Sequence, residues 1–168
     1  MACPGAACKQ FPAGITTAAT WDRDFIYARS YAMGKEYCDL EIHVAMGMVT
    51  VGGTNPYDTG IATWHGVKGM MDSGVQICSK HVIAYEYETF RNPTNFTEPC
   101  GIYNASEQVP ISSNVDENTT HDIHLWSFAE AVSAVTTHKM CAYNAINDTH
   151  SCANSESNNG LLKAEFGF

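Results

Sequence analysis

Positively charged residues are scarce in this 168-residue chain, which has nine Lys and Arg against eighteen Asp and Glu and a formal net charge of −9. Proteins that bind nucleic acids or anionic membranes present clustered Lys and Arg, because these partners carry dense negative charge. The charge balance therefore argues against both kinds of partner. It favours neutral or cationic ligands, although an acidic surface is also common among secreted proteins in general.

Long apolar runs and metal-binding cysteine pairs are also missing. A bilayer-spanning helix needs about 20 consecutive apolar residues, and the chain has no such run. None of the seven cysteines forms a Cys-x-x-Cys pair, so we expect no zinc site. His121, His124 and His138 could suggest a metal, but histidines three residues apart on a helix are commonly surface residues. We expect no metal and no other cofactor.

The first residues do not resemble a secretory signal, because Met1–Cys8 has neither a basic region nor a continuous apolar region. Four Asn-x-Ser/Thr acceptor sequences nevertheless occur, as in secreted glycoproteins. They begin at Asn95, Asn104, Asn118 and Asn147. An N-terminal segment missing from the reading frame would reconcile these two observations.

The composition, with 45% hydrophobic and 16% charged residues, is typical of one globular domain or a piece of one. Helical periods alternate with short β-rich runs, which predicts βα units and a parallel sheet. A helix capped by Asp22 should bury Phe25, Ala28, Ala32 and Met33. Further helices are expected at about 58–71, ending near Gly74, at 125–132 and at 161–166, strands at 40–46, 75–79 and 139–143, and a long surface loop at 90–116.

The segment from Ser79 to Arg91 joins a short apolar strand to several hydrogen-bonding side chains. Lys80 and His81 come at the end of the strand, which is where parallel α/β folds carry their sites. Taken alone, Lys80 and Arg91 are better explained as solvated charges, and His81 as a strand-end histidine with satisfied hydrogen bonds. Further segments of the chain favour a functional site over this simpler explanation.

Several short segments along the chain together form a set of motifs. They are Gly14–Asp22, Ser30–Glu36, Asn55–Gly60, Val67–Met70, Lys80-His81, Ser112–Asp116, His124–Trp126, Phe128-Ala129 and Met140–Asn144. Together they resemble fungal β-glucosidases of glycoside hydrolase family 3. The resemblance spans residues 11–168 and leaves residues 1–10 unmatched.

The resemblance implies an α/β fold, in which residues 11–168 form a partial N-terminal (β/α)8 TIM-barrel-like domain. A closed barrel needs roughly 250 residues, so about half of a barrel is expected. An incomplete barrel exposes strand edges and apolar helix faces. We therefore expect either a missing barrel half as a partner or self-association.

The family implies hydrolysis of terminal non-reducing β-D-glucosyl residues with retention, on β-glucosides and cello-oligosaccharides, by a secreted glycoprotein. Lys80, His81 and Arg91 would hold sugar hydroxyls in the −1 subsite, and Tyr143 would line the same pocket. Adjacent strand residues point to opposite faces. The backbone should therefore break between Lys80 and His81, and the resemblance suggests a cis peptide bond there. It also suggests a disulfide between Cys141 and Cys152, which flank a polar loop.

Retaining hydrolysis needs two carboxyl groups about 5 Å apart. In the family, the nucleophilic aspartate follows a helix that ends like Leu161–Phe168, and the acid/base glutamate comes from a later domain. Neither is expected in this chain, and Glu86 and Glu88 are not substitutes for them. We therefore expect no hydrolysis by this chain alone. The alternatives are a non-catalytic sugar-binding remnant and a truncated gene product without a role.

Overall fold

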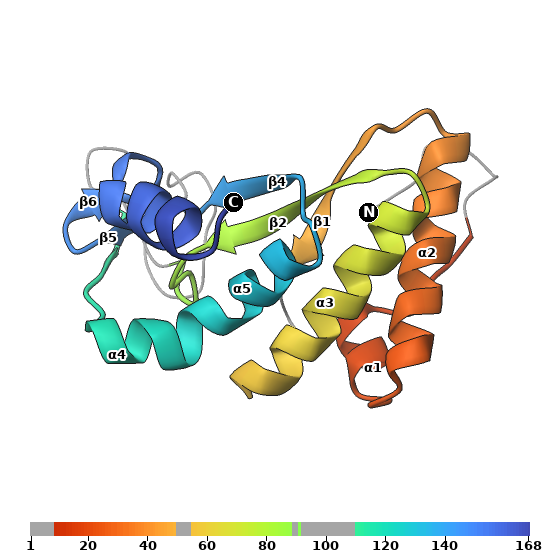
Figure 1. The fold of residues 1–168 in the computed structure, drawn as a ribbon, viewed down its shortest axis with the longest axis horizontal. Coiled ribbons are helices and arrows are strands. Elements are labelled where there is room, and N and C mark those ends of the chain that lie inside the picture. Colours follow the sequence, from red (N-terminus) through yellow and green to blue (C-terminus); the bar gives the residue numbers. More distant parts are fainter. Residues whose placement is uncertain (1–8, 50–54, 89–90, 92–109) are drawn as a thin grey trace, which may run out of the picture. The chain divides into compact units, whose positions relative to one another are not determined.

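The computed structural model describes residues 9–49, 55–88, 91 and 110–168. They belong to two compact units (Figure 1). The first comprises Met1–Lys80 with Leu125–Met140, and the second comprises His81–His124 with Cys141–Phe168. Most of the predicted loop at 90–116, including Asn95 and Asn104, lies outside the described residues.

The first unit is built on a three-stranded sheet with the order β1-β2-β4. β1 and β2 are parallel, with Val44 opposite Gln76 and Ala45 opposite Ile77, and α3 connects them as the crossover helix. The elements are α1 (Gly14–Ala18), α2 (Arg23–Asp39), β1 (Val44–Val49), α3 (Pro56–Asp72), β2 (Gln76–Val82), α5 (Trp126–Ser133) and β4 (His138–Cys141). The ends of β2 and β4 continue into the second unit.

The ends of the two long helices follow from their sequence. The Asp22 carboxylate caps α2 by accepting a hydrogen bond from the backbone N–H of Phe25 at 3.0 Å. Asn55 caps α3 in the same way through the N–H of Tyr57 at 2.9 Å, and Pro56 stands in the first turn. Gly74 follows α3 with a φ of 98°, a conformation that costs glycine little. The predicted helix with its glycine stop is therefore confirmed.

α2 and α3 pack closely because small residues line their contact. A Cβ on Gly69 would lie 2.5 Å from the carbonyl oxygen of Tyr27 and 3.1 Å from Cβ of Ser30. A Cβ on Gly34 would lie 2.8 Å from Cβ of Ser73. The predicted buried face of α2 is wrong in consequence: Phe25 and the two alanines at 28 and 32 are exposed, while Ser30 and Gly34 are buried. Small residues rather than large apolar ones permit this approach.

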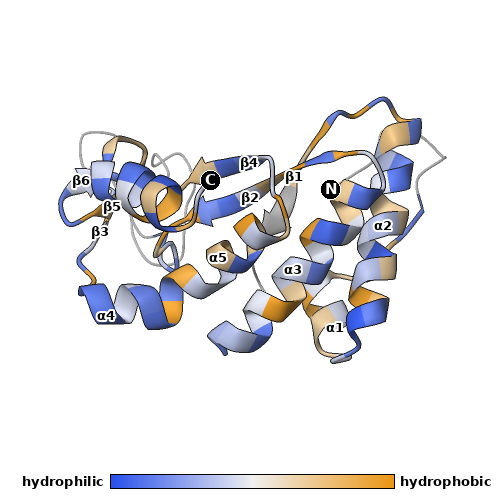
Figure 2. Ribbon diagram, viewed as in Figure 1, coloured by the Kyte–Doolittle hydropathy of each residue, from blue (hydrophilic) through white to orange (hydrophobic). Residues whose placement is uncertain are grey.

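The hydrophobic core of the first unit lies between α3, α5 and the sheet. Its buried members are Ala45, Val67, Met70, Val75, Ile77, Ala131 and Ala134. Met33, Tyr37 and Trp64 pack against it while remaining partly exposed. Figure 2 shows hydrophilic and hydrophobic residues interspersed along α2, so hydropathy alone does not mark its buried side.

The second unit contains short elements. Its sheet has the order β3-β5-β6, with β3 parallel to β5 and β5 antiparallel to β6. The elements are β3 (Ser112–Ser113), α4 (Glu117–Thr119), the π-helical η2 (Thr120–Leu125), β5 (Ala145–Ile146), β6 (Thr149–His150), the 3-10 helix η3 (Ser151–Ala153) and the π-helical η4 (Glu156–Glu165). A disulfide joins Cys141 to Cys152, the pair named from the sequence, with their Cα atoms 5.3 Å apart.

Several predicted boundaries were wrong: β2 runs to Val82 instead of ending at residue 79, β4 ends at Cys141 instead of 143, and two starts differ by four or five residues. The strand expected from residue 40 begins at Val44, because Leu40 and Ile42 donate backbone hydrogen bonds to Glu36 and Tyr37 and so extend the end of α2. The last helix begins at Glu156, five residues before the expected start. The α/β class is confirmed, and the described strands form two small sheets and no closed barrel. None of the described helices combines the length and apolarity needed to cross a membrane.

We predict that Gly69→Ala lowers the free energy of unfolding by about 1–3 kcal/mol, because the new methyl group meets a backbone carbonyl that cannot rotate away. Urea denaturation monitored by tryptophan fluorescence measures this change. Gly14→Ala is the matched control, since its Cβ would meet nothing within 4 Å, and it should change stability by less than about 0.5 kcal/mol. Equal effects of the two substitutions would contradict the close helix contact.

Candidate functional site

Three rings and a guanidinium group meet in the second unit. The His81 ring centroid lies 5.2 Å from that of Tyr85 and 5.4 Å from that of Tyr143, and the two tyrosine rings are 5.6 Å apart. Cζ of Arg91 lies 3.7 Å from the Tyr143 ring centroid, within the range of a cation–π contact. With Glu88, which pairs with Arg91, these residues form what we call the Arg91 cluster.

Hydrogen bonds fix the orientation of the Arg91 side chain. Its Nη1 donates to the Tyr85 hydroxyl and to Oε2 of Glu88, both at 2.9 Å. The hydrogen bond from Tyr85 lowers the pKa of Glu88 below its usual value, and the hydrogen bond and charge of Arg91 act in the same direction, whereas burial opposes them. Burial and the hydrogen bond to Glu88 raise the pKa of Tyr85. Glu88 is therefore an ionised partner of Arg91 at neutral pH and not a proton donor.

The His81 and Tyr85 side chains are positioned by the end of β2. His81 is its next-to-last residue, and the three residues that follow, Val82 to Ala84, are buried. Ala84 has a φ of 56°, which redirects the chain before Tyr85. The expected cis peptide bond between Lys80 and His81 is wrong: the cis bond of this segment joins Val82 to Ile83. Lys80 and His81 both lie within β2, which continues to Val82.

Tyr143 comes from a separate segment that is tied to the end of β2. The backbone N–H of Ala142 donates to the carbonyl of Val82 at 2.6 Å. The Ser151 hydroxyl donates to the same carbonyl at 2.8 Å, and its N–H donates to the carbonyl of Asn144. The segment that carries Tyr143 is therefore fixed to the end of β2, which carries His81, by hydrogen bonds to the backbone.

The buried Asn144 side chain also connects these segments, through several hydrogen bonds. It is 3% exposed. Its Nδ2 lies 3.3 Å from the carbonyl oxygens of Ile83 and Ala84, and 3.0 Å from both Oγ of Ser113 and the carbonyl oxygen of Ala145. One amide group thus joins the turn after β2, β3 and the start of β5.

The surface of the cluster is polar and aromatic. Tyr143 is 49% exposed, and 33% of the Arg91 side chain is accessible. Aromatic faces beside a fixed guanidinium suit a ligand that has both apolar C–H surface and hydroxyl groups. The arrangement offers hydrogen bonding and packing, and its one carboxylate is paired with arginine.

The structure therefore brings together His81, Arg91 and Tyr143 of the residues predicted from the sequence. Lys80 belongs to the first unit, where it is half-buried on β2. Sequence reasoning missed Tyr85 as a member of the cluster, although its position four residues after His81 in the same segment was a usable signal. Of the predicted glycosylation sites, Asn118 and Asn147 are exposed in the second unit.

Two of the three histidines considered as metal ligands lie beside carboxylates, and Nδ1 of the third, His138, lies 3.0 Å from Oγ1 of Thr137. His121 Nε2 lies 3.2 Å from Oε2 of Glu165, and His124 Nδ1 lies 3.0 Å from Oε1 of Glu86. Within the described ranges, no group of three or more His, Cys, Asp or Glu side chains could hold a metal ion. Cys78 is buried, which raises the pKa of its thiol and makes it a poor nucleophile.

No protein-family model matches the chain. The probable β-glucosidase G of Emericella nidulans is 44% identical over 173 residues, which covers 94% of this chain and 21% of that protein. The solved structure of a glycoside hydrolase family 3 β-glucosidase from Neurospora crassa matches with a TM-score of 0.84 at 41% identity, covering 94% of this chain and 20% of that one. β-Glucosidase 3B from Thermotoga neapolitana, solved in complex with glucose, has a TM-score of 0.76 at 26% identity, with 94% and 22% covered.

These similarities confirm the resemblance inferred from the sequence motifs. They also set its extent, because the chain spans about a fifth of the length of the curated relatives it matches.

We predict that Asn144→Asp destabilises the protein by about 3–5 kcal/mol at neutral pH, because it places an uncompensated buried charge among oxygen acceptors. The deficit should shrink at about pH 4, where a protonated carboxyl group can donate a hydrogen bond. Thermal unfolding at both pH values measures it. The control is Asn147→Asp on the exposed turn, which should leave stability unchanged within about 0.5 kcal/mol. A deficit independent of pH would contradict this account of Asn144.

Proposed function

The chain is a homologue of one part of the fungal β-glucosidases of glycoside hydrolase family 3, and we propose from this premise that it forms part of a glucosyl-binding pocket. The ligand is a terminal β-D-glucosyl unit of a β-glucoside or cello-oligosaccharide. The observation that supports this proposal most is the convergence of His81, Arg91 and Tyr143, which come from two separate chain segments.

Each residue of the Arg91 cluster has a chemical role in this proposal. Arg91 and His81 donate hydrogen bonds to the sugar hydroxyls, and a hydrogen bond to a charged group contributes about 1.5–3 kcal/mol net. Tyr143 packs against the apolar C–H face of the sugar ring. Lys80, which the sequence motif also names for the subsite, lies in the first unit and is not a member of this cluster. Glu88 serves the pocket by fixing the Arg91 guanidinium rather than by proton transfer.

The fold proposed for this pocket is part of a (β/α)8 barrel. The parallel β1–α3–β2 unit supports this proposal, since it is the repeating element of such barrels. The carboxyl ends of barrel strands carry the active site, and Lys80 and His81 lie close to that end of β2. The whole protein's reaction would be hydrolysis with retention, in the breakdown of cellulose-derived sugars outside the cell.

The chain's own contribution is binding and not bond cleavage. Glu88 pairs with Arg91, and Glu86 pairs with His124, so neither carboxylate is poised as one of two opposed catalytic groups. A sugar-binding remnant is the second candidate function, and a partner that supplies the remaining barrel is compatible with either. Exposed Asn118 and Asn147 support N-glycosylation of a secreted product.

We predict that the chain binds glucose and cellobiose without hydrolysing p-nitrophenyl β-D-glucoside. Saturation-transfer difference NMR measures binding, and release of p-nitrophenol measures hydrolysis. Arg91→Ala should weaken glucose binding at least about tenfold, which corresponds to the loss of one charged hydrogen bond.

The control for this experiment is Lys68→Ala, which removes an exposed ion pair with Asp72 on α3 of the first unit and should leave glucose binding unchanged. Steady release of p-nitrophenol that Arg91→Ala abolishes would replace the binding role with a catalytic one. Unchanged glucose binding in Arg91→Ala would remove the Arg91 cluster from the pocket.

A further inference from the structure

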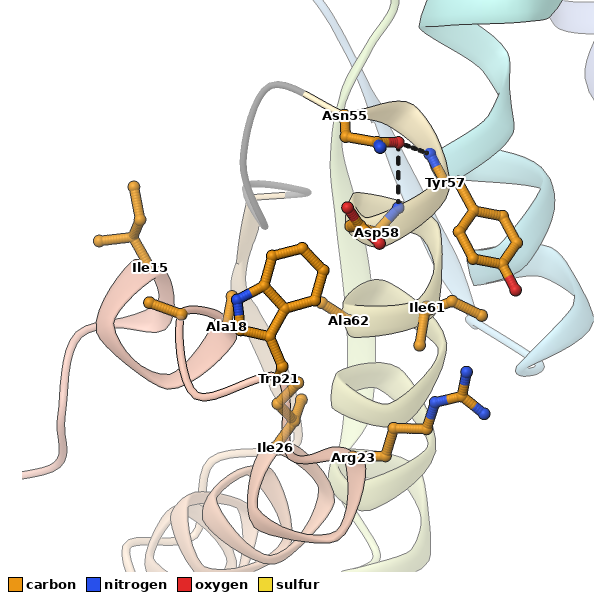
Figure 3. A pocket seen from close by; sticks show the side chains of 11 residues that line it. Ile15, Ala18, Trp21, Arg23, Ile26, Asn55, Tyr57, Asp58, Ile61 and Ala62 are labelled. Atoms are coloured by element: carbon orange, nitrogen blue, oxygen red, sulfur yellow. Dashed lines mark hydrogen bonds between the residues drawn. The ribbon is translucent and has the colours of Figure 1, made fainter.

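A second hollow lies in the first unit, between α1, the start of α2 and the start of α3 (Figure 3). Its volume is about 450 Å³, which falls within the range of small-molecule sites. Most of its lining is apolar, and polar groups stand at its edge. The lining includes Ile15, Ala18, Trp21, Ile26, Ile61 and Ala62.

Trp21 is the unusual residue of this pocket. Its side chain is 74% exposed, although a tryptophan ring gains more free energy from burial than most side chains do. Its backbone has a φ of 58°, a left-handed conformation that is rare and costly for a bulky residue. Figure 3 shows the indole ring among the side chains that line the hollow.

Local hydrogen bonds hold Trp21 in this conformation. The Trp21 N–H donates to the carbonyl of Ala18 at 3.1 Å. The Thr20 hydroxyl donates to the carbonyl of Thr17 at 2.7 Å and accepts from the N–H of Asp22 at 3.2 Å. Thr17 is itself buried. A strained backbone that is fixed from both sides and presents an exposed ring is the pattern expected of a binding residue.

The polar groups at the edge have balanced charge. Arg23 opens α2 and Asp58 lies in the first turn of α3, so one cation and one anion border the apolar floor. Asn55 also lines the pocket, but its Oδ1 accepts hydrogen bonds from the backbone of α3. The site therefore has an aromatic platform, one cationic and one anionic side chain and the neutral polar groups of Asn55 and Tyr57, with no net charge to favour an ionic ligand.

We propose that this pocket is a second carbohydrate-binding site, which takes a glucosyl unit of a neutral β-linked oligosaccharide. The indole ring of Trp21 packs against the apolar C–H face of the sugar, and Arg23 and Asp58 exchange hydrogen bonds with its hydroxyl groups. The choice of glucose as the sugar rests on the proposed function. The existence of the site rests on the geometry of Trp21 and its pocket.

The test uses cellotriose and the full chain in which His81→Ala has weakened the proposed first site. Isothermal titration calorimetry should still detect cellotriose binding in this background. Trp21→Gly should then weaken it at least tenfold. Trp21→Phe keeps a ring and should retain the affinity within about threefold.

Trp21→Gly also separates a binding effect from a folding defect. Glycine adopts a φ of 58° without strain, so this variant should not lower the midpoint of thermal unfolding. Phe25→Ala is the matched control, because Phe25 is an exposed aromatic residue on α2 that lies outside the pocket lining. This variant should bind cellotriose with unchanged affinity.

The outcomes distinguish the two proposals. Binding that is abolished by His81→Ala, or that is unaffected by Trp21→Gly in that background, overturns the second site and leaves the Arg91 cluster intact. Binding that persists in His81→Ala and disappears with Trp21→Gly supports the second site, whether or not the Arg91 cluster binds sugar.

Discussion

The amide group of Asn144 is the contact on which the second unit depends. Its partners Ser113 and Ala145 belong to strands of only two residues, which are too short to hold each other by their own backbone ladders, and its other partners lie in the turn after β2. A buried amide that faces carbonyls from the turn after β2 and from the start of β5 compensates for that shortness. The rings of His81 and Tyr143 meet because the backbone behind them is held in this way.

The first unit depends instead on the close contact between α2 and α3. Ser30, Gly34 and Gly69 let α2 approach α3 closely, and the larger apolar side chains serve the contact between α3, α5 and the sheet. The two helix caps, Asp22 and Asn55, then fix where the helices start. The hollow beside Trp21 lies at these two helix starts, so its geometry depends on the same capping residues.

Much of this fold was predictable from local patterns. The caps at Asp22 and Gly74 and the alternation of helices and strands act over a few residues, so the sequence reveals them. The buried face of α2 was not predictable in this way. Large apolar residues normally mark a buried helix face, whereas here Phe25 lies outside and Ser30 inside, because the neighbouring helix decides the packing.

The residues of the candidate site also fall into those that the sequence predicted and those that it did not. His81, Arg91 and Tyr143 could be named because they stand in motifs that resemble those of a known family. Tyr85 lies four residues after His81 and was a candidate on that ground, but its contact with the other rings depends on the turn at Ala84, whose left-handed φ has no clear sequence signal. The proposed role of Trp21 also has no sequence signal, because it rests on an unusual backbone conformation and an exposed ring and not on residue spacing.

The buried hydroxyl-bearing residues of the first unit also affect how its stability depends on temperature. Ser30, Thr63 and Ser73 are buried where many domains place leucine or isoleucine. Unfolding exposes their polar surface, which lowers the heat-capacity change that apolar surface raises. The stability curve of this unit is therefore flatter than that of an equally large unit with a leucine-rich core. Cooling and moderate heating shift its folding equilibrium comparatively little.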